Sequence, residues 1–349
     1  MTHMNRRGST PRRVTIRDVA RASGTSISTV SVALSGRTGV SEETRARVLE
    51  VANRLGWRPD RRASNLRRQD VRQVGVVYEA ESVFQARLLD ALYVAAEESD
   101  VQLVLAAATE HHDERKCVNA MLQERCQALV LTGSGLSSAE IRAIGRRLPT
   151  LSLCRYVHEQ GIDAVVSDDD MGFAAVVDHL VALGHRDIVH IDGGPGNLLA
   201  DRRSAAYEKA MRAHGLESRI RCVSGGTTIA DGARTAQVVM AMDSLPTAVT
   251  CYNDALGAAF ARTLRAAGIG VPEIISVTGY DDGPDSADPS TSLTTVDQDP
   301  FPLARVSMEL MSRRIDAGAV TQPGDEELVV LPTSLVARQS TGPARSAAS

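Results

Sequence analysis

The apolar positions of the chain follow a helical rhythm in its first part and then switch to an alternation of strands and helices. Between residues 15 and 55, apolar side chains recur at intervals of three and four, which predicts three short helices. From Val74 onward, short runs rich in valine, leucine and isoleucine alternate with helical stretches, as is typical of doubly wound parallel sheets. The predicted strands are 75–78, 101–108, 127–133, 150–155, 164–168, 187–193, 247–253 and 275–282, and the predicted helices are 84–98, 111–124, 138–147, 170–183, 201–214 and 254–267.

The first two predicted helices are short and are joined by a tight turn. Thr15, with Asp18 three residues later, predicts a capped helix start, and Gly24 predicts a left-handed helix end. Ser26 and Ser41 stand where the caps of a second and a third helix are expected. Two short helices joined in this way form the unit that places its second helix in the major groove of DNA. The pattern therefore predicts an all-α helix-turn-helix head.

The formal charge is divided unevenly along the chain. Residues 1–73 contain 16 arginines, no lysine and 6 acidic residues, whereas the whole chain carries a net charge of -4. The head is therefore strongly basic and the remaining residues are acidic. Such a division indicates that the head meets a polyanion. A solvated basic tail is the alternative, and the order of the capping and apolar residues argues against it.

Composition excludes several classes of protein. With 349 residues, 43% of them hydrophobic and 23% charged, the chain is expected to be globular with two or three domains. Apolar runs fall short of the roughly 18 residues that a membrane span needs, and the polar start does not resemble a secretory signal. We therefore expect a cytoplasmic protein without a membrane partner. The five cysteines are scattered and form no CxxC pair, which argues against a disulfide framework and a zinc finger.

The sequence lacks the common motifs of catalysis and cofactor binding. It contains no GxxxxGK[ST], GxSxG, GxGxxG or HExxH motif, so we expect neither an enzyme nor a bound cofactor. Two clusters of acidic and histidine residues have simpler interpretations than metal sites. Residues 111–114 are interpreted as solvated surface, and residues 168–170 as a helix cap with solvated charge.

Residues 14–69 resemble the DNA-binding head of the LacI/GalR family of transcription regulators. The resemblance rests on VTIRDVARASGTSISTVSVALSG and VSEETRARVLEVANRLGWRPDRRASNLRR, which follow the family pattern without a gap through Arg58-Pro59. It implies that the start of the second helix reads bases through Ile27, Ser28 and Val32. It also implies phosphate contacts from Ser26, Thr29, Ser31 and Thr44. Many members have an arginine at the position of Val32, where valine would favour thymine methyl groups; a buried core valine is the alternative.

The segment after Pro59, DRRASNLRRQ, corresponds to the hinge helix of the family. The resemblance implies that two copies of this helix, one from each subunit of a homodimer, lie in the minor groove. Leu66 matches the leucine that wedges a base step, and Ala63 matches its small neighbour. Arg61 and Arg62 are expected to contact phosphates. A flexible basic linker is the alternative for the protein without DNA.

The remainder of the chain resembles the periplasmic-binding-protein-like core of the same family. The resemblance implies two doubly wound α/β lobes with a cleft between them. We expect a disordered basic tail over 1–13, the helix-turn-helix domain over 14–59, the hinge over 60–71 and the two-lobed domain over 72–340. Lobe 1 is expected over about 72–165 and 297–325, and lobe 2 over about 166–296 and 326–340. Residues 341–349 are expected to form a disordered tail.

Several residues of this core match the effector cleft of the family. The stretches LGHRDIVHIDGGPGN, YNDA, GYDD and LTTVDQD carry the match. Ligands bind at the carboxyl ends of the strands in such sheets. For Asp254, a helix N-cap and a ligand contact remain equally open. The resemblance implies effector contacts from Arg203, Asn253, Asp281, Phe84, Arg155 and Gln298.

Lobe 1 departs from the family pattern on the cleft wall. EAESVFQAR retains only Phe84 from an aromatic stretch of the family, and Cys154 stands where an aspartate is usual. One interpretation is a redox-sensitive thiol whose pKa is lowered by the neighbouring Arg155. The other interpretation of Cys154 is a small buried apolar residue.

Together these features predict a sequence-specific DNA-binding regulator, a repressor that binds a palindromic operator in double-stranded DNA as a homodimer. A small polar effector, such as a sugar or related metabolite, is expected in the cleft between the lobes. Two alternatives stay open. One is a regulator whose cleft responds to a protein partner or to thiol oxidation. The other is a solute-binding module, against which the basic head and the absence of a signal sequence argue.

Overall fold

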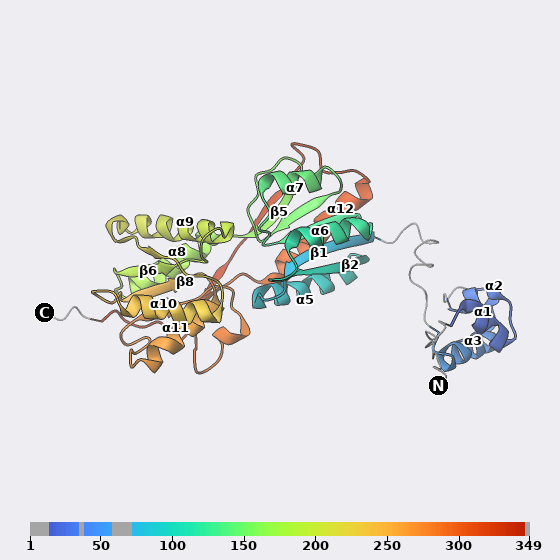
Figure 1. Ribbon diagram of the computed structural model, residues 1–349, viewed down its shortest axis with the longest axis horizontal. Coiled ribbons are helices and arrows are strands. Elements are labelled where there is room, and N and C mark those ends of the chain that lie inside the picture. The colour runs from blue at the N-terminus through green and yellow to red at the C-terminus, as the bar shows by residue number, and fades with distance from the viewer. Residues whose placement is uncertain (1–13, 35–37, 58–71, 346–349) are drawn as a thin grey trace, which may run out of the picture. The chain divides into compact units, whose positions relative to one another are not determined.

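A computed structural model describes residues 14–34, 38–57 and 72–345 of the chain. It divides into two compact units, Met1–Val71 and Arg72–Ser349, which are drawn in Figure 1 and treated separately below. The first unit is a small helical head. The second unit contains two α/β lobes.

The head is built from helices α1 (Ile16–Ser23), α2 (Ile27–Leu34) and α3 (Glu42–Arg54). The predicted caps are confirmed: the backbone N–H and the hydroxyl of Thr15 donate to Asp18 at 2.9 and 2.6 Å, and Gly24 has a φ of 67°. Each cap involves residues within a few positions of the helix end. The cap residues seen in the sequence therefore mark where each helix begins or ends in the structure. A small apolar core joins the three helices through Val19, Ala20, Val30, Ala33, Val48, Val51 and Ala52.

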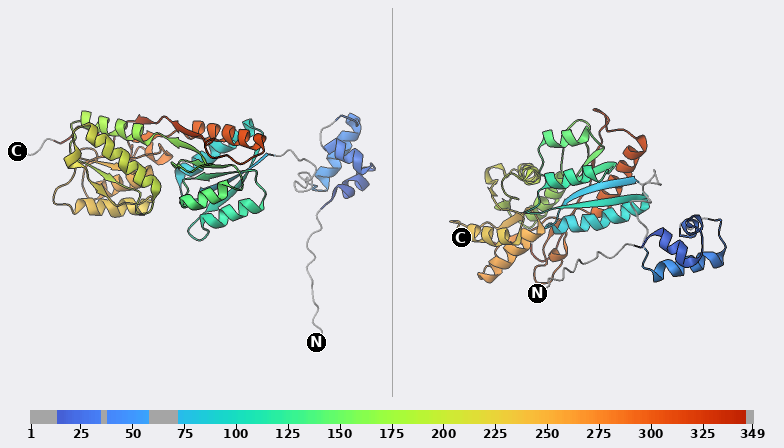
Figure 2. Two further views of the ribbon diagram at one scale, coloured as in Figure 1. Left: turned by 90° about the horizontal axis from the view of Figure 1, so that it is seen from above. Right: turned by 45° about the vertical axis from the view of Figure 1, so that its right-hand side comes forward.

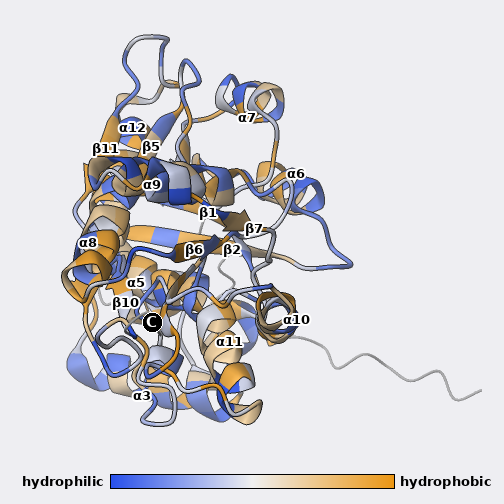
Figure 3. Cartoon of the chain, turned by 90° about the vertical axis from the view of Figure 1, so that its left-hand side faces the viewer, coloured by the Kyte–Doolittle hydropathy of each residue, from blue (hydrophilic) through white to orange (hydrophobic). Residues whose placement is uncertain are grey.

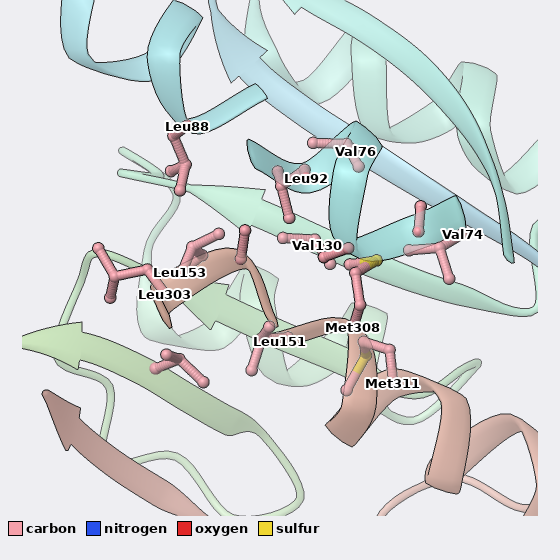
Figure 4. Packing of buried hydrophobic residues seen from close by; sticks show 14 of the residues in the cluster. Val74, Val76, Leu88, Leu92, Val130, Leu151, Leu153, Leu303, Met308 and Met311 are labelled. Atoms are coloured by element: carbon pink, nitrogen blue, oxygen red, sulfur yellow. The ribbon is translucent and has the colours of Figure 1, made fainter. Parts of the chain in front are cut away.

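Lobe 1 has a parallel sheet of six strands in the order β11-β5-β4-β3-β1-β2. Helices α5 (Val83–Glu98) and α12 (Pro300–Ala317) cover one face, and α6 (Glu114–Gln123) and α7 (Ser138–Gly145) cover the other. Figure 4 shows the first of these layers, in which Met308 and Met311 of α12 pack against the strands beside Leu92 of α5. The strands are β1 (Arg72–Glu79), β2 (Val101–Ala108), β3 (Ala128–Thr132), β4 (Thr150–Leu153), β5 (Asp163–Ser167) and β11 (Leu328–Leu331).

Lobe 2 has a parallel sheet of four strands in the order β7-β6-β8-β9. Helices α8 (Asp169–Ala182) and α9 (Leu198–Ala213) cover one face, and α10 (Ile229–Met240) and α11 (Asp254–Ala266) cover the other. Figure 2 shows helices on both sides of each sheet, and Figure 3 shows the strands as the hydrophobic centre of each lobe. The strands are β6 (Ile188–Ile191), β7 (Cys222–Val223), β8 (Ala248–Cys251) and β9 (Ser276–Thr278), with short 3-10 helices at Glu217–Arg219 and Pro284–Ser286.

Strands β5 and β11 belong to the sheet of lobe 1, whereas the sequence analysis began lobe 2 near residue 165 and assigned residues 326–340 to it. β5 pairs with β4 in parallel, with Leu151 opposite Asp163, and β11 pairs with β5, with Leu328 opposite Ala164. The boundary expected near residue 165 therefore falls after β5, and the expected return to lobe 2 at residue 326 falls after β11. An apolar run shows that a strand is buried but does not show which neighbour it pairs with. The crossover also contains an antiparallel pair, β10 (Thr295–Asp297) with β12 (Ser334–Val336).

Sequence analysis assigned no element to α10, α12, β7 or the strands after residue 290. In α12, Pro300 and Pro302 at the start suggest a loop, although proline fits the first turn of a helix. The expected disorder after residue 340 is also wrong for residues 341–345. There the backbone N–H of Ala344 donates to the carbonyl of Leu183 at 2.8 Å, so this segment is held against lobe 2. None of the helices in the described part of the chain is long and apolar enough to cross a membrane.

Candidate functional site

The exposed start of α2 forms a compact group of hydroxyl side chains beside an apolar one. The hydroxyl of Ser26 accepts the backbone N–H of Thr29 at 3.0 Å, and lies 2.7 Å from the hydroxyl of Ser28 and 2.8 Å from that of Thr29. Ile27, 47% exposed, lies next to this group with no cover from the helical core. Helix N-termini with hydroxyl groups suit phosphate contacts, because their backbone N–H groups point outward. The arrangement is that of a helix start presented to a ligand.

The other expected DNA contacts are distributed around this helix. Ser31 and Val32 are partly buried, and a β-carbon on Gly39 would lie 3.6 Å from Val32 Cγ1. Val32 is thus absent from the apolar core of the head but lies against the following loop. Thr44 is in the first turn of α3, where its hydroxyl accepts from Ser41 at 2.9 Å. The hinge residues Arg61, Arg62, Ala63 and Leu66 lie outside the described residues.

In lobe 2, a buried arginine is surrounded by acidic and aromatic side chains. Arg203 has a side chain only 3% exposed, its Nη1 donates to the carbonyl of Tyr252 at 2.6 Å, and its Nε donates to Asp169 at 3.4 Å. Its Nη2 lies 3.6 Å from the carboxylate of Asp281. The guanidinium also lies over the rings of Tyr280 and Tyr252, at 3.8 and 4.8 Å from their centroids. The rings and carboxylates together replace the water that a buried cation would lose.

The topology of lobe 2 explains why these residues meet. Tyr252 follows β8, Tyr280 and Asp281 follow β9, and Asp169 begins α8 directly after the crossover from lobe 1. The carboxyl ends of parallel strands lie along one edge of the sheet, which is the edge that binds ligands in open α/β folds. Arg203 reaches this edge from the second turn of α9. Arg203 and Asp281, two of the residues expected to contact an effector, thus lie together at this edge.

Burial changes the acidity of the carboxyl groups in this cluster. Burial raises the pKa of Asp281 to about 6, although the charges of Arg203 and Arg87 and a hydrogen bond from Gln298 act in the opposite direction. Burial also raises the pKa of Asp169, against the charge of Arg203. The cluster thus contains two buried carboxyl groups, those of Asp169 and Asp281, beside one buried guanidinium, that of Arg203. When both carboxyl groups are ionised, their negative charge exceeds the positive charge of the guanidinium.

Asn253 and Asp254, which both follow β8, have different roles in the fold. The side-chain oxygen of Asn253 accepts the N–H of Leu256 at 2.9 Å, and its amide nitrogen donates to a backbone carbonyl at 3.0 Å, so Asn253 is the N-cap of α11. Asp254 does not cap the helix. Its buried carboxylate accepts the N–H of Gly283 at 2.7 Å and the hydroxyl of Thr295 at 2.5 Å, which ties the crossover to the loop after β9.

Gln298 is brought to the cluster, but two residues expected from lobe 1 have other partners. Gln298 Nε2 donates to the Asp281 carboxylate at 2.5 Å. Phe84 is buried in the lobe 1 core beside Leu88. Arg155 is buried and its Nη1 donates to backbone carbonyls in the loop after β3, at 2.6 and 2.7 Å. In this structure these two side chains hold lobe 1 together.

The thiol of Cys154 does not have the lowered pKa that the redox interpretation requires. Burial raises the pKa of Cys154 to about 12, and the opposing charge of Arg203 does not overcome burial. The interpretation of Cys154 as a thiol activated by Arg155 therefore gains no support from the structure. The structure favours the alternative, because Cys154 packs against the lobe 1 core.

Sequence analysis did not identify three residues of the cluster. Asp169 was grouped with solvated charge, yet it shares a buried helix face with Phe173 and Val176, and this spacing was the signal. Tyr252 and Tyr280 lie beside recognised residues but gave no signal of their own. Arg87 of lobe 1 donates to the backbone after β9, a contact between distant segments that no local pattern reveals.

Among the described residues, no group of three His, Cys, Asp or Glu side chains is arranged to hold a metal ion.

Comparisons with known proteins agree with this architecture. Residues 15–60 match the model of bacterial regulatory proteins of the lacI family, and residues 177–341 match a periplasmic binding protein-like domain. The transcriptional regulator AscG of Escherichia coli is 29% identical, over 77% of this chain and 82% of its own. The regulator GalR of the same organism is 28% identical, over 93% of this chain and 95% of its own.

Solved structures show similarity over up to 95% of the chain. The crystal structure of a LacI transcriptional regulator from a Rhodococcus species is 35% identical, covers 78% of this chain and 99% of its own, and has a TM-score of 0.73. The lac repressor dimer bound to operator and an anti-inducer is 25% identical, covers 95% of this chain and 100% of its own, and has a TM-score of 0.80. The chain therefore belongs to the LacI family and is a DNA-binding transcriptional regulator.

Proposed function

We propose that this regulator is a repressor that binds a palindromic operator as a homodimer and is controlled by a small polar effector between its lobes. The buried cluster of Arg203, Asp169 and Asp281 at the carboxyl ends of the lobe 2 strands carries this proposal. Buried charge of this kind is costly for stability alone, which favours a role in binding. Relatives named the ribose operon repressor and the repressor PurR, and a CelR structure in complex with cellobiose, support the same class of function.

The chemistry of the cluster favours an effector rich in hydroxyl groups. Asp169 and Asp281 offer carboxylate oxygens as acceptors, and Arg203 offers guanidinium N–H groups as donors. A hydroxyl group both donates and accepts, so a sugar or a related neutral metabolite satisfies both kinds of partner. The cluster gives no support to thiol-based control, because the Cys154 thiol is not activated.

Exposed apolar side chains on two helices of the core support a homodimer. On α5, Val83, Tyr93 and Val94 are exposed, and the neighbouring strand β2 lies at the edge of its sheet with half-buried apolar side chains. On α10 of lobe 2, Ile229 and Val238 are exposed as well. Large apolar residues and an unpaired sheet edge are features that subunit contacts cover. We further propose that the protein works in the cytoplasm, by binding and without catalysis, as the membership of its family suggests.

Selection of genomic DNA fragments by the purified full-length protein, at near-physiological salt, tests the proposed function. We expect the recovered fragments to share a palindrome whose half-sites match the spacing of two heads. Binding that depends on salt but shows no common motif would contradict a sequence-specific repressor, because such binding reflects phosphate contacts alone.

Ile27 is expected to read a methyl group in the operator. Helix α2, with the sequence ISTVSVAL, carries no charged or amide side chain that could form a bidentate contact with a base. Replacing the thymine beside Ile27 by deoxyuridine removes one methyl group and should weaken binding about fivefold, or roughly 1 kcal/mol. The same replacement should have no effect on the variant Ile27→Ala, and gel-shift titration of the two proteins on both operators measures the difference. A parent protein that binds the two operators equally would refute this contact.

Leu66 is expected to wedge a base step at the centre of the operator. Leu66→Ala removes the apolar wedge and should weaken operator binding by at least tenfold, since the bend that brings more protein onto the DNA is lost. Dimerisation, measured by sedimentation, should not change, because the core carries the proposed subunit contacts. Equal operator affinity in the variant and the parent would remove Leu66 from the minor groove.

A further inference from the structure

The loop after β9 is the point where several parts of the core converge. Asp281 and Asp282 have φ values of 113° and 46°, a left-handed backbone that residues other than glycine adopt at a cost. Such a conformation persists when its surroundings impose it. The loop that carries the candidate effector carboxylate is therefore held by its neighbours and not by its own sequence preference.

Lobe 2 and the crossover supply most of these restraints. The Asp281 side chain accepts from Gln298 at 2.5 Å, and the Asp282 side chain accepts from Arg338 at 2.6 Å. Backbone N–H groups are also engaged, since that of Asp281 donates to the carbonyl of Val296 at 2.8 Å. These contacts fix the loop to its own lobe but leave the carbonyl groups of Asp281 and Asp282 available to lobe 1.

Arg87 of lobe 1 supplies the remaining restraint. Its Nη1 donates to the carbonyl of Asp281 at 3.0 Å and to that of Asp282 at 2.7 Å. The helix that carries it approaches closely, because a β-carbon on Gly283 would lie 3.9 Å from Cγ1 of Val83. One guanidinium from lobe 1 thus bridges two consecutive carbonyl groups of lobe 2, in charge-assisted hydrogen bonds that are stronger than neutral ones.

We propose that Arg87 is a positioning residue that clamps lobe 1 to the Asp281–Gly283 loop and so links the effector carboxylate to α5. The clamp and the carboxylate belong to the same residue, Asp281, whose carbonyl meets Arg87 while its side chain faces Arg203. A ligand that moves the Asp281 side chain must also strain or strengthen the clamp. Since α5 carries the exposed residues of the proposed subunit contact, the state of the cleft is passed to the dimer through one side chain.

Three variants of the full-length protein test the clamp by hydrogen exchange. Arg87→Met keeps the length of the side chain but removes its donors, and Arg87→Lys restores a cation with a donor. The control, Arg305→Met, removes an exposed arginine of lobe 1 whose partner, Glu309, lies on the same helix. We expect the amides of residues 281–283 to exchange about tenfold faster in Arg87→Met, with partial recovery in Arg87→Lys and no change in Arg305→Met.

Unchanged exchange at residues 281–283 in Arg87→Met would overturn the clamp. Operator binding tests the link to α5, and this readout alone rests on the proposed function. We expect Arg87→Met to change operator affinity at least threefold relative to Arg305→Met, while exchange within the head, residues 16–54, stays the same. Faster loop exchange with unchanged affinity would overturn the link. A parent protein that binds no operator would instead contradict the proposed function, and the exchange result would still decide the clamp.

Discussion

Replacing Arg203 by alanine is expected to lower the free energy of unfolding by about 3–5 kcal/mol. The change leaves the carboxylates of Asp169 and Asp281 buried without the cation that lies between them, at 3.4 and 3.6 Å. It also exposes the ring faces of Tyr252 and Tyr280 to an empty space. Removing one member of a buried ionic group costs far more than the group contributes as a whole, because the remaining charges lose both water and partner.

The neighbouring arginine provides a matched control for this experiment. Arg202 pairs with Asp170 at 2.8 Å and lies over the ring of Tyr156, but its side chain is 31% exposed. Arg202→Ala should therefore cost less than about 1 kcal/mol. Equilibrium urea unfolding of both variants measures the difference. Equal losses would show that the Arg203 cluster is hydrated in solution and would remove the argument for a preformed site.

Because Arg203→Ala is expected to destabilise the protein, this variant is poorly suited to the study of effector binding. A variant that loses the response to an effector through unfolding of lobe 2 says nothing about contact with the ligand. Asp281→Asn is a milder probe, since the side chain keeps its shape and an oxygen that can accept from Gln298. The family resemblance identified both residues but could not show that they depend on each other.

The sequence predicted those parts of the fold that depend on neighbouring residues. The helix starts at Thr15, Ser26 and Ser41 are confirmed because each cap closes within three residues of its own position. Strands β1 to β6, β8 and β9 were recognised from apolar runs, which are also local features of the sequence. The pairing of β5 with β11, by contrast, joins segments more than 150 residues apart, and a run of apolar residues is compatible with either sheet.

The sequence also pointed to some residues of the candidate site, namely those that lie in motifs of neighbouring residues. The family resemblance named Arg203, Asp281 and Gln298 as effector contacts, and in the structure these three side chains lie together beside the carboxyl ends of the lobe 2 strands. It could not carry Arg87 or Asp169, whose roles follow from how this chain packs α5 and α8 against the β9 loop. Phe84 is the opposite case. It matches the residue type of the family at this position, yet its side chain is packed in the core of lobe 1.

The stability of the protein is expected to depend on pH through Asp281. Burial raises the pKa of Asp281 in the folded protein to about 6, against an ordinary value of 3.8. The folded state therefore binds a proton more readily than the unfolded state between these two values. The stability that this group contributes is fully present below about pH 4 and is lost as the pH rises through about 6. The loss amounts to about 3 kcal/mol, from a shift of about two pKa units.

Comparing Asp281→Asn with the parent measures the contribution of Asp281 together with its electrostatic effect on Asp254, whose pKa the charge of Asp281 raises. The parent should lose about 3 kcal/mol relative to the variant between pH 4 and pH 7, measured by urea unfolding at each pH. Asp288→Asn is the control, because the pKa of Asp288 is shifted in the opposite direction. Hydrogen bonds from Ser290 lower the pKa of Asp288 below 3.8, so its contribution to stability is lost only as the pH falls below about 4. The difference between the parent and that variant should therefore stay nearly constant between pH 4 and pH 7.

A constant difference between the parent and Asp281→Asn across this range would mean that the Asp281 carboxylate is solvated in the folded protein. Near neutral pH, the expected state is a buried carboxylate that accepts a hydrogen bond from Gln298 and lies 3.6 Å from the guanidinium of Arg203. Below about pH 6 the same group carries a proton and becomes a donor. An effector whose hydroxyl donates to Asp281 should therefore bind more weakly as the pH falls through 6, in the same range where the parent gains stability. The two measurements share one titration, and their midpoints must agree if Asp281 is both the buried carboxylate and the effector contact.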